Sequence, residues 1–261
     1  MCNGSLEKWI FLKNRELSLG WQARKKIILD IAKGISYLHH SCRNGIIHLD
    51  IKPHNILLDG ELNAKLSDFG LARFIDRDRS HVLTAARGTQ GYMAPECWKK
   101  KITEKADVYS FGIVVLEIIC GRRNLEHSLL EEYGTLLHLV REKAEAGQLS
   151  DLVDKQSEDM QQNEEAAVKM IRVAISCLWD DSTRRPSMSM LVKILEDDLE
   201  PEMIHDYSFL TINPMESSTE TTAPVSAPQL PEILSGPRCT AQSGESGRHN
   251  FGGLLQLSIC Y

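Results

Sequence analysis

Apolar residues recur at roughly helical spacing along the segment from Leu19 to Ser41, while lysines and arginines occupy the other faces. This pattern predicts an amphipathic helix. A second segment, Thr103 to Gly121, is apolar on nearly every side from Phe111 onwards, which predicts a helix in the middle of a domain. Thr103 is the expected N-cap of that helix and Gly121 its expected C-terminal cap.

Shorter patterns predict a hairpin and further helices. Ile56 to Leu58 and Ala64 to Leu66 are two short strand candidates, and the segment between them opens with Asp59-Gly60, a dipeptide that favours chain reversal. Two more helices are expected at Thr135 to Ala146 and Glu164 to Trp179, followed by one that starts near Pro186, because proline suits a first helical position.

The pattern weakens from about Pro201, where the composition shifts towards Ser, Thr, Pro and Gly. Such a segment buries too little apolar surface to offset the entropy of ordering it. We therefore expect a folded domain over residues 1–200 and a disordered Ser/Thr/Pro-rich tail over residues 201–261.

Composition and charge narrow the functional classes. The chain has 261 residues, 42% of them hydrophobic, which is enough to bury a sizeable core in one domain and still carry a tail. A net charge of -6 argues against a general nucleic-acid binder. The seven cysteines are scattered without a CxxC pair, which is typical of reduced thiols in an intracellular chain.

No targeting or membrane segment is expected. The first residues are largely polar and do not form a signal peptide. The most apolar stretch, Phe111 to Cys120, contains Gly112 and Glu117 and is too short to span a bilayer. The sequence as it stands therefore predicts a cytoplasmic chain without a membrane segment.

The candidate chemistry lies in the stretch from His48 to Gly70, which reads HLDIKPHNILLDGELNAKLSDFG. Pro53 blocks a helix in its polar first part, so His48 to Asn55 is expected to form a loop. Folding the hairpin would bring Asn55, before the first strand, near Asp68, after the second. An amide oxygen and a carboxylate are hard ligands that suit Mg²⁺ shared with substrate phosphates.

Two further side chains of the loop fit phosphoryl transfer. Asp50 stands five positions before Asn55, near enough to orient or deprotonate a hydroxyl while a metal ion holds a phosphate. Lys52 adds a cation where negative charge develops during the transfer.

Three tripeptides in this order and spacing resemble the motifs of a protein kinase. His48-Leu49-Asp50 with Asn55 resembles the catalytic loop, Asp68-Phe69-Gly70 the metal-binding DFG, and Ala94-Pro95-Glu96 the APE. The resemblance implies that Asp50 and Lys52 are catalytic and that Asn55 and Asp68 bind Mg²⁺ with ATP. It gives structural roles to five residues: His48, Phe69, Glu96, Asp107 and Arg185.

The resemblance also implies roles that the residues alone would not suggest. Gly88-Thr89 matches the part of the family that receives the hydroxyl-bearing residue of a protein substrate. Asp107 matches an aspartate that hydrogen-bonds the backbone of the catalytic loop, although by itself it would only complement a helix dipole. Arg185 matches an arginine that pairs with the APE glutamate, here Glu96, and would otherwise be taken for a surface charge.

Several phrases indicate the branch of the family. Lys52 in DIKPHN and Thr89 in GTQGY resemble the serine/threonine branch, and ARKKIILDIAKGISYLHH and ITEKADVYSFGIVVLEIICGRRN are similar to plant receptor-like kinases, most closely the lectin-type group. The resemblance covers roughly Asn3 to Glu200. It implies a mainly α, kinase C-terminal-lobe fold with a short β-hairpin, of a kind that in membrane-anchored relatives lies on the cytoplasmic side.

Two departures from the family pattern affect the prediction. Leu49 replaces the arginine that often pairs with a phosphate on the activation segment, so we expect no phosphorylation switch through that pair at acceptors such as Ser80 or Thr84. The sequence also contains no GxGxxG loop and no VAIK-type lysine, so the N-terminal lobe that covers the nucleotide is expected to be absent. Two hypotheses follow: a serine/threonine protein kinase, or a catalytically inactive fragment that acts as an interaction module.

Overall fold

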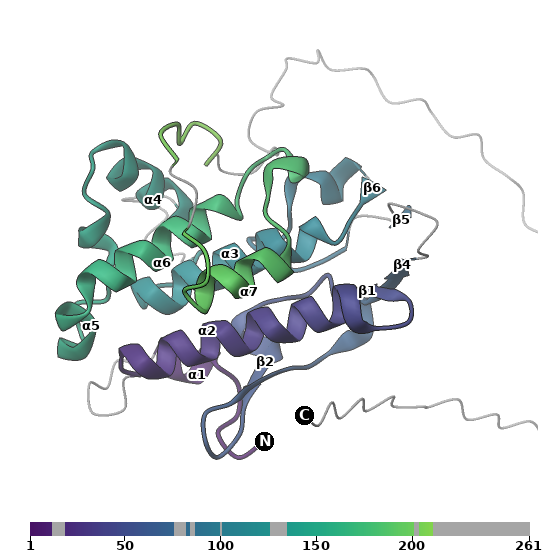
Figure 1. Cartoon of the computed structure of the whole chain (residues 1–261), viewed down its shortest axis with the longest axis horizontal. Coiled ribbons are helices and arrows are strands. Elements are labelled where there is room, and N and C mark those ends of the chain that lie inside the picture. Colours follow the sequence, from purple (N-terminus) through teal and green to yellow (C-terminus); the bar gives the residue numbers. More distant parts are fainter. Residues whose placement is uncertain are drawn as a thin grey trace, which may run out of the picture. The chain divides into compact units, whose positions relative to one another are not determined.

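The computed structural model describes residues 1–11, 19–75, 82–83, 87–99, 101–125, 135–200 and 204–210. These residues form a mainly α fold with a few short strands, as predicted (Figure 1). Its α-helices are α1 (Glu7–Ile10), α2 (Trp21–Ser36), α3 (Lys105–Cys120), α4 (Leu136–Glu145), α5 (Glu158–Gln162), α6 (Glu164–Ser176) and α7 (Met188–Leu195). Its strands form antiparallel pairs: β1 (Gly45–Ile47) with β4 (Arg73–Ile75), β2 (Ile56–Leu58) with β3 (Ala64–Leu66), and β5 (Val82–Leu83) with β6 (Lys101–Ile102).

Helix α3 lies at the centre of the core, as its apolar sequence predicts. All its residues from Ala106 to Cys120 are buried, and α6 packs along it (Figure 1). The two helices approach closely at Gly112, where an added Cβ would lie 2.8 Å from Cβ of Cys177 and 2.9 Å from the carbonyl oxygen of Ala174. A glycine at this position therefore permits the packing of α3 on α6.

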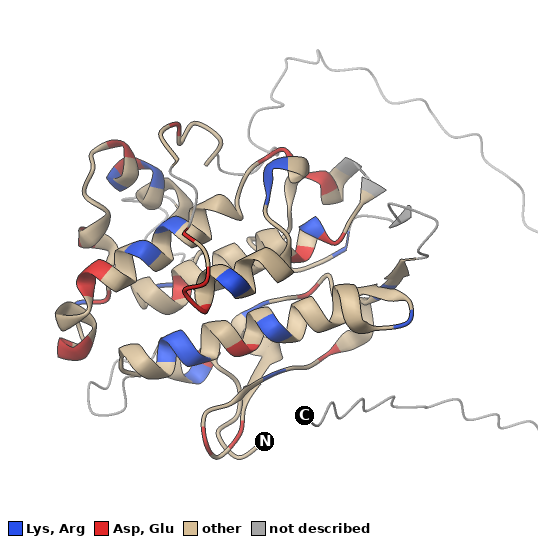
Figure 2. Ribbon diagram, in the orientation of Figure 1, with Lys and Arg blue, Asp and Glu red and all other residues tan. Residues whose placement is uncertain are grey.

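Helix α2 is amphipathic, as its periodicity predicts, and continues into a π-helical turn over Tyr37–Ser41. Its apolar stripe is buried, and its buried Arg24 lies 2.5 Å from Asp154 and donates to backbone carbonyls. On its polar side, Lys25 and Lys33 pair with the acidic residues Asp197 and Glu196 after α7, so charges of both signs alternate here (Figure 2).

The predicted β-hairpin is confirmed with its predicted strands. Strand β2 pairs with β3 so that Ile56 lies opposite Leu66 and Leu58 opposite Ala64. The chain before α1 extends this sheet, because the amide of Leu6 donates to the carbonyl of Ile56 at 2.7 Å and Leu58 donates to Gly4 at 2.8 Å. Strand β2 is thus hydrogen-bonded along both edges, to β3 on one edge and to the segment before α1 on the other.

Some predicted helix ends differ from the structure. The helix after residue 186 begins at Met188, because the side chain of Ser187 caps it by accepting from the amide of Met190. The predicted start near Pro186 is therefore confirmed to within two residues, and the hydroxyl of Ser187 satisfies an amide at the helix start, which proline does not. Likewise Glu104, not Thr103, is the N-cap of α3, although the Thr103 hydroxyl accepts from the amide of Lys105 at 3.2 Å.

Residues 204–210 lie beyond the predicted domain end and pack against the core. Phe209 and Leu210 are buried, and Ile204 and Tyr207 are partly buried against the same cluster. Packing thus continues past residue 201, although the division of the chain into domain and tail stays a prediction, since residues 211–261 lie outside the described residues. In the described part of the chain, no helix combines the length and the apolar character that a membrane span requires.

Candidate functional site

The loop between β1 and β2 is held by a carboxylate of α3. Asp107 accepts hydrogen bonds from the backbone amides of His48 and Leu49, both at 2.8 Å, and Nε2 of His39 lies 2.9 Å from the same carboxylate. Leu49 has a φ of 65°, a left-handed conformation that is unfavourable for a residue with a side chain. The two hydrogen bonds that the carboxylate of Asp107 accepts offset this cost and hold the backbone directly before Asp50.

Asp50 lies at the centre of a cluster of polar side chains. Lys52 donates to one of its carboxylate oxygens at 2.8 Å, and the hydroxyl of Thr89 donates to the other at 2.6 Å. Lys52 also donates to the Thr89 hydroxyl at 2.7 Å, so the three side chains form a closed triangle. The side-chain amide of Asn55 donates to the carboxylate of Asp50 at 2.7 Å and to the backbone carbonyl of Asp50 at 3.0 Å.

These contacts determine the charge of Asp50. Burial raises the pKa of this carboxyl, but the hydrogen bonds from Lys52, Thr89 and Asn55 and the positive charge of Lys52 together outweigh burial and bring the pKa below its ordinary value. Asp50 is therefore ionised at neutral pH. An ionised carboxylate can accept a hydrogen bond from an incoming hydroxyl and orient it.

The hairpin brings the two predicted metal ligands to one end of the sheet. The amide and the hydroxyl of Ser67 both donate to the carbonyl of Asn55, at 2.9 and 2.8 Å, which places Asn55 beside the residue that precedes Asp68. Asp68 has a φ of 61°, is exposed, and accepts from the amide of Gly70 at 3.3 Å.

These residues fit a hard divalent cation. Asn55 directs its amide nitrogen towards Asp50, so its amide oxygen is the atom able to bind a cation, and Asp68 adds a carboxylate. Such oxygen ligands suit Mg²⁺ that also binds substrate phosphates. Within the described residues no group of three or more His, Cys, Asp or Glu side chains could hold a metal by itself.

His48, in the loop after β1, contacts Phe69, in the turn that follows Asp68. Their ring centroids are 4.8 Å apart, and Nε2 of His48 lies 3.1 Å from the carbonyl oxygen of Ser67. The fully buried His48 thus joins the loop of Asp50 to the far strand of the hairpin.

The predicted substrate-binding residues lie against the loop that carries Asp50. Gly88 has a φ of 136°, and an added Cβ would lie 3.2 Å from the carbonyl oxygen of Leu49 and 2.7 Å from a side-chain carbon of Met93. Only glycine permits this approach without strain. The next residue, Thr89, reaches Asp50 as described.

Glu96 and Arg185 form a two-pronged ion pair. Nitrogens of the guanidinium lie 2.6 and 2.8 Å from the two carboxylate oxygens, and one of them also donates to the carbonyl of Lys105 at 2.9 Å. The side chain of Arg185 is fully buried. The pair therefore joins the short 3₁₀ turn Pro95–Lys99 to the loop before α7.

A buried network that the sequence analysis did not identify holds the loop after Thr89. The hydroxyl of Tyr92 donates to Glu117 of α3 at 2.9 Å, and Asn124 donates to Glu117 through its backbone and to the carbonyl of Gly91 through its side chain. Burial raises the pKa of Glu117 to about 8. A charged residue within an otherwise apolar helix was the signal that could have identified it, because such a residue requires partners.

Not every candidate can be placed. The expected phosphate acceptors Ser80 and Thr84 lie outside the described residues.

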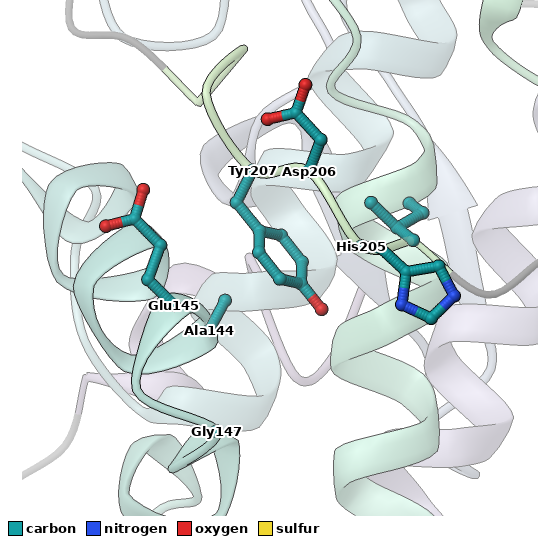
Figure 3. Close-up of a pocket in the computed structure, with 7 residues that line it drawn as sticks. Ala144, Glu145, Gly147, His205, Asp206 and Tyr207 are labelled. Carbon is teal, nitrogen blue, oxygen red and sulfur yellow. The ribbon is translucent and has the colours of Figure 1, made fainter.

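A separate cavity of about 520 Å³ lies between the end of α4 and residues 204–207. Figure 3 shows the ring of Tyr207 pointing into the space between these segments, with Glu145 on the side of α4. None of its lining residues belongs to the cluster around Asp50.

Comparisons with known proteins agree with this geometry. Residues 1–195 match the protein kinase domain family. A G-type lectin S-receptor-like serine/threonine-protein kinase of Arabidopsis thaliana is 45% identical over 199 residues, which are 75% of this chain and 24% of the relative. A probable LRR receptor-like serine/threonine-protein kinase of the same plant is 44% identical over 216 residues, covering 81% of this chain and 21% of the relative. The chain thus spans about a quarter of the length of these relatives.

Proposed function

This chain belongs to the protein kinase family, and we propose that it acts as a serine/threonine kinase that transfers the γ-phosphoryl group of ATP to a protein hydroxyl. The observation that carries this proposal is the cluster in which Asp50 meets Lys52, Thr89 and Asn55. The names of the receptor-like serine/threonine relatives support the choice of acceptor.

The side chains of this cluster would share the work of phosphoryl transfer. Asp50, ionised and held by Asn55, would accept the hydrogen bond of the substrate hydroxyl and orient its oxygen towards the phosphate. Lys52, now bound to Asp50 and Thr89, would stabilise the negative charge that develops on the transferred group. Asn55 and Asp68 would hold Mg²⁺, which neutralises phosphate charge when it is bound. Gly88 and Thr89 would receive the hydroxyl-bearing residue of the substrate.

The same proposal includes the division of the chain into domains and its place in the cell. We propose that residues 1–200 act as part of a kinase domain, with residues 201–261 as a tail, and that the domain works on the cytoplasmic side, as expected for receptor-like kinases. Its partners would be ATP and a protein substrate.

Exchange of the central carboxylate tests the proposal. We expect Asp50→Ala to lower phosphate transfer from ATP to a generic protein substrate by about 10²- to 10⁴-fold, the contribution typical of a positioned acid or base. Asp198→Ala, which removes an exposed carboxylate after α7, is the matched control and should leave the rate unchanged. Equal rates for the Asp50 variant and the unmodified chain would contradict the proposal.

A second function is favoured by one observation in the sequence, which contains neither a GxGxxG loop nor a VAIK-type lysine. These are the parts of the family that position the ATP phosphates. A chain that transfers no phosphate but still binds the protein substrate of a full-length relative would be an interaction module. In that case Asp50→Ala would leave binding of the substrate unchanged.

A further inference from the structure

An aromatic stack joins residues 204–210, here called the C-terminal strap, to the loop after α6. The ring of Phe209 lies on the ring of Trp179, with centroids 3.7 Å apart and planes inclined by 25°. The guanidinium carbon of Arg184 lies 3.3 Å from the centroid of the same Trp179 ring. Phe209 is 8% exposed and its neighbour Leu210 only 2%, so the strap packs like a core element although the family match ends at residue 195.

The stack continues into the ion pair at the end of the substrate-binding loop. The carbonyl oxygen of Trp179 accepts a hydrogen bond from Nε of Arg185 at 2.7 Å. The two other nitrogens of that guanidinium bind the carboxylate of Glu96. A continuous series of contacts therefore runs from Phe209 through Trp179 and Arg185 to Glu96.

We propose that Phe209 is a positioning residue for the substrate-binding loop: its stacking on Trp179 fixes the loop that carries Arg185, and Arg185 in turn holds Glu96. The inference rests on the proposed function in assigning substrate binding to the loop around Thr89. The contacts themselves are independent of that assignment.

The burial of Arg185 favours a coupling between Phe209 and the substrate-binding loop over a role of Phe209 in local packing alone. Arg185 is a buried cation, and a buried cation is stable only while its hydrogen-bond partners stay in place. Three acceptors for this guanidinium lie on different elements: the carbonyl of Trp179, the carbonyl of Lys105 and the carboxylate of Glu96. If Trp179 moves, Arg185 loses one acceptor and the geometry of its pair with Glu96. Aromatic stacking and cation–π contact on Trp179 oppose that movement.

Hydrogen exchange of the full chain tests this coupling without requiring kinase activity. The amides of Tyr92 and Cys97 are hydrogen-bonded within the substrate-binding loop and report on its order, and the amide of Leu210, bonded to the carbonyl of Tyr207, reports on the strap. In Phe209→Ala we expect peptides covering residues 88–98 to exchange about two- to tenfold faster, the factor that loss of one aromatic pair implies. Peptides from α2 should not change.

Two further variants complete the test. Phe209→Tyr keeps the ring and should restore slow exchange. Leu199→Ala, which truncates an exposed apolar side chain that precedes the strap in the sequence, should resemble the unmodified chain. The proposal is overturned if residues 88–98 exchange at the original rate in Phe209→Ala, or if exchange rises equally in α2, since Phe209 would then contribute only to overall stability.

The outcome is distinguishable from failure of the proposed function. If the chain transfers phosphate, Phe209→Ala should raise KM for the protein substrate about two- to tenfold, with a smaller change in kcat, because the cluster around Asp50 is intact. If the chain transfers none, faster exchange at residues 88–98 would still support the coupling, and only the kinase proposal would fail.

Discussion

Two carboxylates of the site differ in charge because their surroundings differ. Asp50 is buried but receives hydrogen bonds from Lys52, Thr89 and Asn55, which keep its pKa low. Glu117 is almost completely buried, and burial outweighs the hydrogen bonds from Asn124 and Tyr92, so its pKa rises to about 8. One carboxylate is thus charged at pH 7, while the other holds a loop as a mostly neutral group.

Glu117 makes stability depend on pH in a predictable direction. Its pKa is raised from 4.5 when unfolded to about 8 when folded, so the folded chain binds this proton more tightly. The stabilisation is complete below pH 4.5 and is lost as the pH rises towards 8. Glu117→Gln cannot titrate, so its free energy of unfolding should improve relative to the unmodified chain as the pH rises from about 5 to about 9.

Urea denaturation at several pH values measures this difference. Glu142→Gln, which changes an exposed glutamate of α4, is the control and should follow the unmodified chain throughout. Parallel pH profiles for Glu117→Gln and the unmodified chain would show that Glu117 does not take up a proton on folding.

Helices and strands differ in how fully their sequences specify them. The periodicity of α2 and the apolar run of α3 predicted both helices, because each buries a large, recognisable face. The Asp59-Gly60 turn between two short apolar runs predicted the hairpin with its observed strands. The start of α7 was predicted only to within two residues, because Ser187 and Pro186 both suit a helix start and only the fold selects between them.

Close helix packing in the core depends on one glycine. At Gly112 of α3, an added Cβ would meet the backbone of α6 at 2.9 Å, whereas at Gly34 of α2 it would meet only a methyl carbon of Leu66 at 3.3 Å. Gly112→Ala should therefore lower the free energy of unfolding by about 1–3 kcal/mol, as overpacking usually does. Gly34→Ala should be neutral or stabilise by up to about 1 kcal/mol, because alanine is the better helix former.

The two alanine variants are compared by urea denaturation under one set of conditions. Both change a glycine inside a long helix, so helix propensity is matched and only the local space differs. Equal stabilities would mean that α3 and α6 can separate without cost.

One buried helix organises the whole domain. Asp107, near the start of α3, holds the loop between β1 and β2, and Glu117, ten residues later, holds the loop after Thr89. At 1.5 Å per residue the two carboxylates lie about 15 Å apart along the axis of a helix that is buried on all sides. The resemblance to kinases pointed to Asp107, which by its sequence alone would only complement the helix dipole. No motif pointed to Glu117 or Phe209, because their contacts with Tyr92 and Trp179 appear only in the fold.

Nucleotide binding is the property on which the two proposed functions differ most. The sequence printed here contains no glycine-rich loop and no lysine of the kind that position ATP in the family, so an experiment on this chain alone tests what Asn55, Asp68 and their surroundings contribute. For a kinase, calorimetry of the purified chain with ATP and Mg²⁺ should show binding that Asp68→Ala removes and that Glu61→Ala, an exposed change in the hairpin turn, preserves. Absence of heat with the unmodified chain would favour the interaction module, since two oxygen ligands on a hairpin would then be insufficient to hold Mg²⁺ and phosphates.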